Sequence, residues 1–159
     1  MIKKSSILAV YEILKTYSDE NHILTTEDII KKLSTNYDID LERKSIYRHI
    51  QTLIDFGYDI SVFADNKKGY YLIERAFEQS EAHLPIDAVH SSNFIPQKAT
   101  KELSKKLAAT QSKYFAEKVN RMLYVNYTTK TQNNQTFYNL DILDEAILNK
   151  RQISFYYCK

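Results

Sequence analysis

The sequence predicts a mainly α-helical protein with a small β-hairpin. Only two Gly and two Pro occur in 159 residues, which favours helices over successive tight turns. Apolar residues recur at helical spacing, most clearly in residues 40–57. Residues 58–73 instead alternate apolar and polar side chains on both sides of a polar loop, which is the pattern of two paired strands.

The stretch 40–57 is the best-defined helix. Ile46, Ile50 and Leu53 form one apolar side at helical spacing. Asp40 is expected to cap its start, and the glycine that follows the helix, Gly57, is expected to adopt a left-handed conformation. The opposite side carries side chains that can all donate hydrogen bonds: Lys44, Ser45, Arg48, Gln51 and Thr52. A helix that is apolar on one side and cationic on the other suits the major groove of DNA.

Two further helices are expected before this one. Apolar residues at helical spacing indicate the first between Ile7 and Tyr17, and Thr25 with Asp28 has the spacing of a capping box at the start of the second. Two helices and a turn that lead to a third helix with a polar outer face form a helix-turn-helix arrangement.

The hairpin that follows occupies the position of the wing in a winged helix. Tyr58, Ile60 and Val62 alternate with polar residues, and the loop after them carries Lys67 and Lys68. These two lysines are placed to meet phosphates of the neighbouring groove.

The character of the chain changes after residue 75. Pro85 is expected in the first turn of one helix and Pro96 at the opening of another, with a strand over residues 123–127. A last helix is indicated over residues 140–147, and residues 153–157 read as the beginning of a strand with no later partner. This pattern suggests a longer protein that is cut just inside its next domain. We therefore expect three parts: residues 1–78, 79–136 and 137–159.

Composition limits the possible functions. The net charge is only +2, and residues 1–80 hold 11 Lys and Arg against 13 Asp and Glu. Any affinity for DNA must therefore come from the placement of the cations. The basic N-terminus is followed by charged residues too early for a signal peptide or membrane span, and the single cysteine, Cys158, fits a reducing cytoplasm.

No pattern in the sequence indicates catalysis or a cofactor. There is no Gly-rich phosphate loop, no nucleophile with a nearby base and no CxxC motif, so we expect no enzyme. His83, Asp87 and His90 have the spacing of one helical face, but a metal site would need a further strong ligand. An ordinary exposed or interface surface is the simpler reading of these three.

Several strings resemble bacterial WYL-domain transcriptional regulators with a DeoR-like winged helix. The segment 45–50 with Leu53 and Gly57 is similar to the recognition helix of that family, and residues 69–72 with Arg75 are similar to its wing and exit. Residues 86–107 resemble the helices that link the domains of that family, and residues 130–157 resemble the entry to its WYL barrel.

The resemblance implies a cytoplasmic, sequence-specific regulator that binds double-stranded DNA as a homodimer. It implies that residues 1–78 are the winged helix-turn-helix domain, that residues 79–136 are a helical linker that takes part in dimerisation, and that residues 137–159 begin a truncated WYL domain. The barrel of the family senses a nucleotide or nucleic-acid ligand, but the tripeptide that names the WYL domain is absent here, as is most of the barrel. His49 stands where the family pattern usually has Asp, and Pro85 interrupts a helix that is commonly continuous. Ligand sensing is therefore not assigned to these residues.

Candidate DNA contacts follow from the helix and the hairpin. Arg48 is placed to pair with guanine, and Arg43 is expected to meet phosphate. Tyr47 and His49 flank the outer face, where contact with the DNA backbone, packing or a hydrogen bond between helices are all open. The expected set comprises Arg43, Lys44, Ser45, Tyr47, Arg48, His49, Gln51, Thr52, Lys67 and Lys68. A winged-helix module that binds a protein partner without DNA is the alternative, which the acidic balance of residues 1–80 supports.

Overall fold

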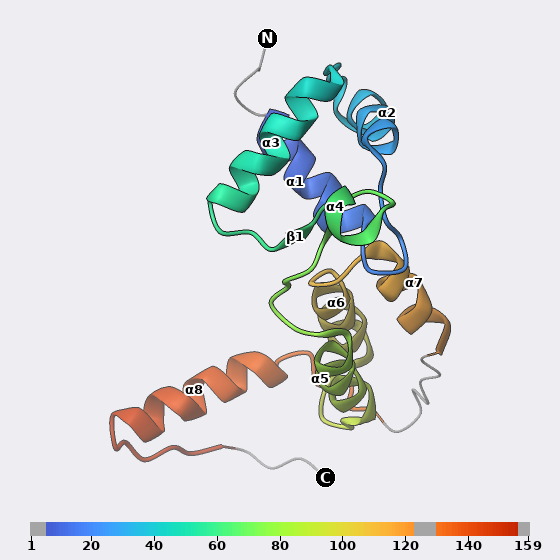
Figure 1. Ribbon diagram of the computed structural model, residues 1–159. Coiled ribbons are helices and arrows are strands. Elements are labelled where there is room, and N and C mark those ends of the chain that lie inside the picture. Colours follow the sequence, from blue (N-terminus) through green and yellow to red (C-terminus); the bar gives the residue numbers. More distant parts are fainter. Residues whose placement is uncertain (1–5, 123–129, 156–159) are drawn as a thin grey trace.

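The structure is a computed structural model that describes residues 6–122 and 130–155. Over these residues the chain is mainly helical with a two-stranded antiparallel sheet, as predicted (Figure 1). The first part contains α1 (Ser6–Tyr17), α2 (Thr26–Tyr37), α3 (Arg43–Asp55), β1 (Ile60–Ser61), α4 (Phe63–Asn66) and β2 (Tyr71–Leu72). The second part contains α5 (Gln79–Ser91), α6 (Gln97–Ala108), α7 (Lys113–Met122) and α8 (Thr136–Leu148).

The first core forms where α1, α2 and α3 meet. Each helix contributes apolar residues at helical spacing, so one side of each is removed from water. The fully buried side chains include Ile13 and Leu14 of α1, Ile29 and Leu33 of α2, and Ile46 of α3. Figure 1 shows the three helices crossing one another, with β1 below α1 in this view. The apolar stripes expected from the sequence are therefore the sides that pack.

The ends of α3 agree with the sequence at one end and differ at the other. Gly57 is left-handed, with φ of 108°, and its N–H donates to Ile54 O at 2.9 Å while Tyr58 N–H donates to Leu53 O at 3.1 Å. These two bonds form a Schellman motif, which stops the helix. The helix begins later than expected: its N-cap is Glu42, not Asp40. Leu41 explains the shift, because it packs against the first core and α3 begins only after it.

The start of α2 has the expected capping box. Thr25 Oγ1 accepts from Asp28 N–H at 3.2 Å, and the Asp28 carboxylate accepts from Thr25 N–H at 3.0 Å. These hydrogen bonds lower the pKa of Asp28, with the Thr25 hydroxyl as the largest cause.

The hairpin is present but carries a feature that the sequence did not predict. Its strands pair Ile60 with Leu72 and Ser61 with Tyr71, and the connection contains the single-turn helix α4. The Asn66 side chain holds this connection, because its oxygen accepts from the N–H groups of Lys68 and Gly69 at 2.7 and 2.8 Å. Local side-chain bonds to the backbone hold this short segment. Its four residues are too few to show the apolar period by which a longer helix is recognised.

A backbone bridge ties the hairpin to the segment between α1 and α2. Leu24 N–H donates to Tyr70 O at 2.9 Å, and Tyr70 N–H donates to Leu24 O at 2.8 Å. The neighbouring Gly69 permits this approach, since a Cβ atom there would lie 2.2 Å from Leu24 O. The hairpin is therefore fixed to the helical core.

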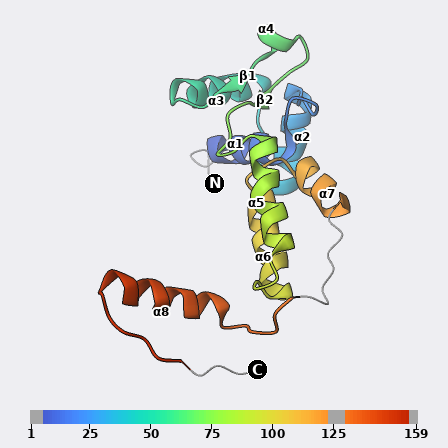
Figure 2. The same ribbon diagram turned by 90° about the horizontal axis from the view of Figure 1, so that it is seen from below.

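The second core lies between α5, α6 and α7 and contains Ala82, Ile86, Ala108, Phe115 and Val119. Figure 2 shows α5 and α6 side by side along their lengths.

The expectation that Pro85 opens a helix is wrong, because α5 begins six residues earlier and contains Pro85 in its interior. Glu81 explains the early start, since its carboxylate accepts from Glu78 N–H at 2.9 Å at the first turn. Pro96 directly precedes α6, as expected.

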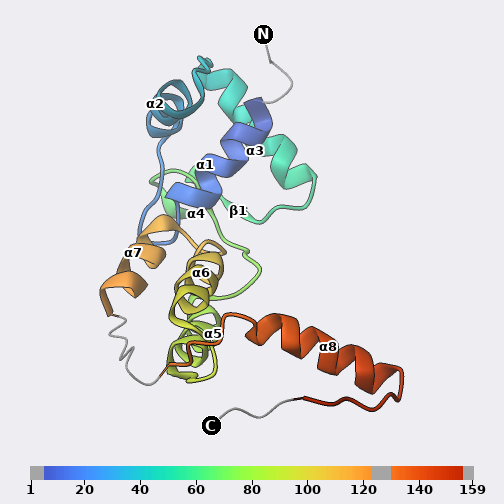
Figure 3. The same ribbon diagram turned by 180° about the vertical axis from the view of Figure 1, so that it is seen from behind.

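The last described part of the chain extends away from both cores. In Figures 1 and 3, α8 projects from the region of α5 and α6. The strand expected over residues 123–127 lies outside the described residues. Residues 153–155 are exposed and form no strand, so the described part of the strand expected at 153–157 is wrong. Without a neighbouring strand within the described chain, these three residues have no backbone partner to pair with.

Candidate nucleic-acid interface

The outer side of α3 presents two cations to solvent. Lys44 and Arg48 lie one helical turn apart, and both are exposed. Neither forms an ion pair or a side-chain hydrogen bond with a residue in the described ranges 6–122 and 130–155. The side chains directly behind them, Ile46, Ile50 and Leu53, are at most 5% exposed. Buried residues thus fix the helix while its cations stay available to a ligand.

Other polar residues of α3 are already engaged within the protein. Arg43 forms an ion pair with Glu27 of α2. Gln51 Nε2 donates to the Asp55 carboxylate at 2.8 Å, and Thr52 Oγ1 donates to Arg48 O at 2.8 Å. All of these side chains are exposed, so their bonds compete with water and with any ligand. Ser45 is half-buried between the core and the outer side.

His49 connects α3 to α1. Its Nε2 lies 2.9 Å from Ser6 Oγ, so of the roles left open by the sequence, a hydrogen bond between helices is the one observed. Burial lowers the pKa of His49, and the nearby Arg48 charge lowers it further. The ring is therefore neutral near pH 7 and adds no positive charge to the surface.

Tyr47 is 47% exposed on α3. It is one of the groups that raise the pKa of Tyr70, although burial is the first cause of that raised pKa.

The hairpin connection carries the other two predicted cations. Lys67 has a left-handed backbone with φ of 58°, and its Nζ donates to Ala64 O at 2.8 Å. Lys68 is exposed, and its side chain has no hydrogen bond or ion pair with any residue that the structure describes. Asn66 Oδ1 accepts from the N–H of Lys68, and Lys67 N–H donates to Phe63 O at 2.9 Å, so the backbone of both lysines is held even though their side chains reach into solvent.

Glu27 is part of this surface, although no pattern in the sequence indicated it. Its carboxylate neutralises Arg43 and joins the first turn of α2 to the first turn of α3. The spacing of 16 residues between the two gives no local signal, because the pair depends on how two helices cross. Arg43 is therefore less available than Lys44 or Arg48.

A polar joint connects the two cores and so positions the surface relative to α5–α7. Asp19, in the loop after α1, accepts from Ser112 Oγ at 2.6 Å and lies 2.7 Å from His22 Nδ1. Burial acts to raise the pKa of Asp19, but these hydrogen bonds outweigh burial and leave the pKa lowered. The Gln111 amide also donates to Phe77 O.

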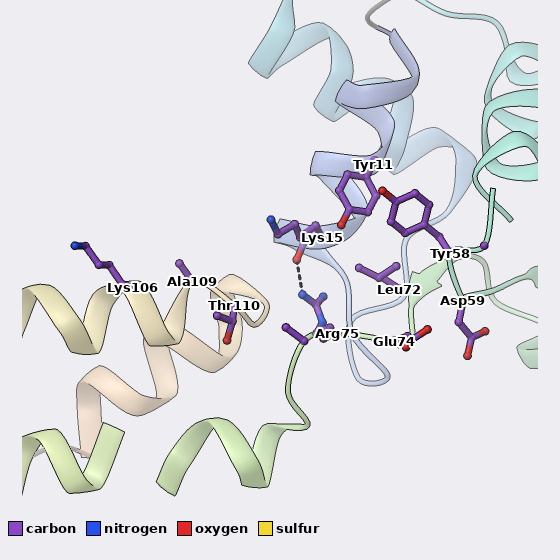
Figure 4. A pocket seen from close by; sticks show the side chains of 12 residues that line it. Tyr11, Lys15, Tyr58, Asp59, Leu72, Glu74, Arg75, Lys106, Ala109 and Thr110 are labelled. Carbon is purple, nitrogen blue, oxygen red and sulfur yellow. Dashed lines mark hydrogen bonds between the residues drawn. The ribbon is translucent and has the colours of Figure 1, made fainter. Parts of the chain in front are cut away.

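Arg75 completes this joint beside a hollow of about 520 Å³. Its guanidinium donates to Lys15 O at 2.9 Å and to Ser18 O at 2.6 Å, which satisfies the end of α1. Figure 4 shows Arg75 reaching the backbone of Lys15, with Tyr11 and Tyr58 on the other wall of the hollow. Since Arg75 is used by the backbone and the hollow is open, we assign it no ligand.

The described residues contain no group of three or more His, Cys, Asp or Glu placed to hold a metal ion. His83 lies edge-on to Phe115 with ring centroids 4.8 Å apart, and both ring nitrogens of His90 lack a partner among the described residues. Burial lowers the pKa of His90, followed by the effect of Lys130, which caps the end of α5 through Val89 O and Ser92 O. The ring contact with Phe115 gives His83 a packing role. Within the described ranges, no helix has the length and apolar character needed to cross a bilayer.

Comparisons with protein-family models, with curated proteins and with solved structures find no match for the chain.

Proposed function

We propose that the protein binds double-stranded DNA sequence-specifically and regulates transcription, with α3 in the major groove and the hairpin connection on the backbone. The observation that carries this proposal is the pair of unengaged cations, Lys44 and Arg48, on a helix fixed from behind by the first core. An α-helix fits the width of the major groove, and an arginine there can make two hydrogen bonds to guanine.

Phosphate contacts would supply much of the affinity. Lys68 is the freest cation of the hairpin connection, and Lys67 can leave the Ala64 carbonyl at small cost because both are exposed. Arg43 would contact phosphate only by sharing or giving up Glu27. We therefore assign base selection to Lys44, Arg48 and Gln51, and backbone contacts to Lys67 and Lys68.

The resemblance to WYL-domain regulators with a DeoR-like winged helix supports the same proposal. It adds a homodimer on a two-fold operator, with half-sites about 34–36 Å or a multiple of that apart. It also adds a cytoplasmic location and, through a WYL barrel, a nucleotide or nucleic-acid ligand.

A protein-binding module without DNA is the second candidate function. The excess of acidic residues in 1–80 favours it. So do Phe56, which directly follows α3, and Phe63, at the start of α4, because their side chains are 82% and 55% exposed. Exposed aromatic residues are enriched at protein interfaces. This module would bind its partner with weak dependence on salt.

Selection of bound duplexes from a random pool, followed by titration, separates the two candidates. For a DNA-binding protein, the selected duplex binds more tightly than a scrambled one, and log affinity falls with log salt by about 0.9 for each phosphate neutralised. Enrichment of no sequence, with equally weak binding of both duplexes, would contradict the proposal.

Arg48→Ala tests the mechanism. We expect it to weaken binding of the selected duplex by about 1–3 kcal/mol and to relax the preference at one base pair, because a bidentate contact is lost. Lys118→Ala is the matched control, since Lys118 is an exposed cation on α7, away from α3. Equal effects of the two substitutions would mean that Arg48 contributes only general charge.

A further inference from the structure

Helix α8 has an apolar surface that no described part of the chain covers. Its 13 residues include Tyr138, Ile147 and Leu148, which are 65%, 73% and 82% exposed. Leu140, Ile142 and Leu143 are also exposed, so the apolar residues surround most of the helix. A helix that is apolar on most sides is normally buried, and a free helix of this length is marginal in water. The helix therefore requires a partner.

The charge of α8 restricts what that partner is. The helix carries Asp141, Asp144 and Glu145 and no cation between residues 136 and 148. None of these three carboxylates pairs with a cation in the part of the chain that the structure describes. Asp141 and Asp144 are three residues apart and so lie on the same side of the helix. The partner surface should be apolar with positive charge at its edge.

Helix α6 provides a surface of this kind. A groove of about 540 Å³ runs along it, with Ala99 and Leu103 in its wall. Its charged lining residues are Lys98, Glu102 and Lys106, so cations outnumber the single carboxylate. Both lysines are exposed and form no ion pair with any described residue. The whole helix carries four lysines against one glutamate, Glu102. The groove is thus complementary to α8 in both polarity and charge.

The α8 helix of the same chain does not fill this groove. Thr131 N–H donates to Asn93 O at 2.8 Å, which holds the segment before α8 beside the α5–α6 connection, and Phe137 lines one part of the groove. From there the helix leads away from α6, as Figures 1 and 3 both show. Its later turns cannot reach α6 of the same chain without a change at this anchor.

We propose that α8 lies in the α6 groove of a second copy of this chain, and that the second copy returns its own α8 in the same way. The lengths agree, because 13 helical residues span about 20 Å and the 12 residues of α6 about 18 Å. A reciprocal exchange gives a closed two-fold dimer in which each contact occurs twice. This contact rests on the proposed function only in that it would supply the dimer for a two-fold operator.

Two charge-reversed variants of the whole chain test the proposal without DNA. The groove variant is Lys98→Glu with Lys106→Glu, and the helix variant is Asp141→Lys with Asp144→Lys. Sedimentation analysis should show the unaltered chain as a dimer, with a dissociation constant at least about tenfold higher for each variant alone, because like charges then meet twice. An equal mixture of the two variants should dimerise again, since each α8 then meets a groove of opposite charge.

Each remaining outcome overturns the proposal. A monomeric unaltered chain removes the second copy as the partner. Loss of the dimer in the helix variant but not in the groove variant means that α8 pairs with another surface. A mixture that stays monomeric, while each variant keeps its helical circular dichroism, contradicts the reciprocal contact. Lys118→Glu on α7 is the control and should leave the dimer unchanged. Because DNA is absent, failure here leaves the proposed DNA binding standing, and failure of DNA binding leaves the dimer standing.

Discussion

Lys44 and Arg48 differ from the other polar residues of α3 in what they must give up to bind a ligand. Arg43 would have to release Glu27, and His49 would have to release Ser6. Lys44 and Arg48 exchange only water, since no described residue pairs with them. This difference is a reason to give the two cations the leading part in the proposed recognition, with Gln51 taking part only when it leaves Asp55.

Gly69 is the residue on which the position of the hairpin depends. A Cβ atom at this position would meet Leu24 O at 2.2 Å and Leu24 C at 2.8 Å. Both are backbone atoms, so the strand segment itself must move and the two Leu24–Tyr70 hydrogen bonds are expected to break. We predict that Gly69→Ala lowers the free energy of unfolding by about 1–3 kcal/mol, at about 0.5–1.5 kcal/mol for each bond. Urea unfolding measures this loss.

Gly57→Ala is the control for this substitution. Its Cβ would meet no atom within 4 Å, so only the backbone strain at φ of 108° acts against it. Hydrogen exchange at the amides of Leu24 and Tyr70 should accelerate in Gly69→Ala much more than in Gly57→Ala. Unchanged protection of both amides in Gly69→Ala would contradict the role given to this glycine.

At the level of elements, the sequence predicted those that repeat an apolar residue every turn. The stripes of α1, α2 and α3 are buried, and Gly57 stops α3 by the bond pattern that glycine favours. Helix α4 was missed because four residues have no period and Asn66 holds its connection. The start of α3 was misplaced because Leu41 packs against the core before the helix begins.

The interior proline of α5 shows where a local rule yields to packing. A proline at the start of a helix loses nothing, but Pro85 is the seventh residue of α5 and removes the N–H that would bond to Glu81 O. Burial of Ala82 and Ile86 against α6 and α7 keeps the helix continuous through this position. The residues that bury Ala82 and Ile86 lie in α6 and α7, so the local sequence around Pro85 could not show that the helix continues through it.

We therefore predict that Pro85→Ala stabilises the protein. The substitution restores one helical hydrogen bond and removes the contact between the ring and the preceding turn, for a gain of up to about 3 kcal/mol in the free energy of unfolding. Thermal and urea unfolding of the two proteins measure the change. Destabilisation instead would mean that the shape which Pro85 gives to α5 is needed for its packing on α6.

At the scale of the whole molecule, two cores are joined by few polar contacts. Asp19 of the first part and Ser112 of the second are 93 residues apart, and no local pattern links them. The candidate site lies within the first part, and its exposed cations on α3 and the hairpin were proposed from local sequence, whereas Glu27 of α2, which pairs with Arg43, was not. The joint and the exposed state of α8 could not be predicted in this way, because both depend on how separate helices are placed.

The joint should make stability depend on acid. The lowered pKa of Asp19 means that its ionised form contributes stability above the unfolded value of 3.8, and this contribution is lost as the pH falls through the folded value. Ser112→Ala removes a hydrogen bond to this carboxylate. We expect it to lower the free energy of unfolding at pH 7 by about 1.5–3 kcal/mol, the range for hydrogen bonds to charged groups. Urea unfolding at a series of pH values between 7 and 2 measures both effects.

The pH series also separates the joint from a general loss of packing. In Ser112→Ala, stability should fall less steeply below pH 3.8 than in the unaltered protein, because the pKa of Asp19 in the folded state then lies closer to its unfolded value. Ser104→Ala is the matched control, since Ser104 is also buried and its Oγ has no partner among the described residues. It should leave the acid dependence as it is. If both serine variants keep the acid dependence of the unaltered protein, the Asp19–Ser112 bond does not hold the two cores together.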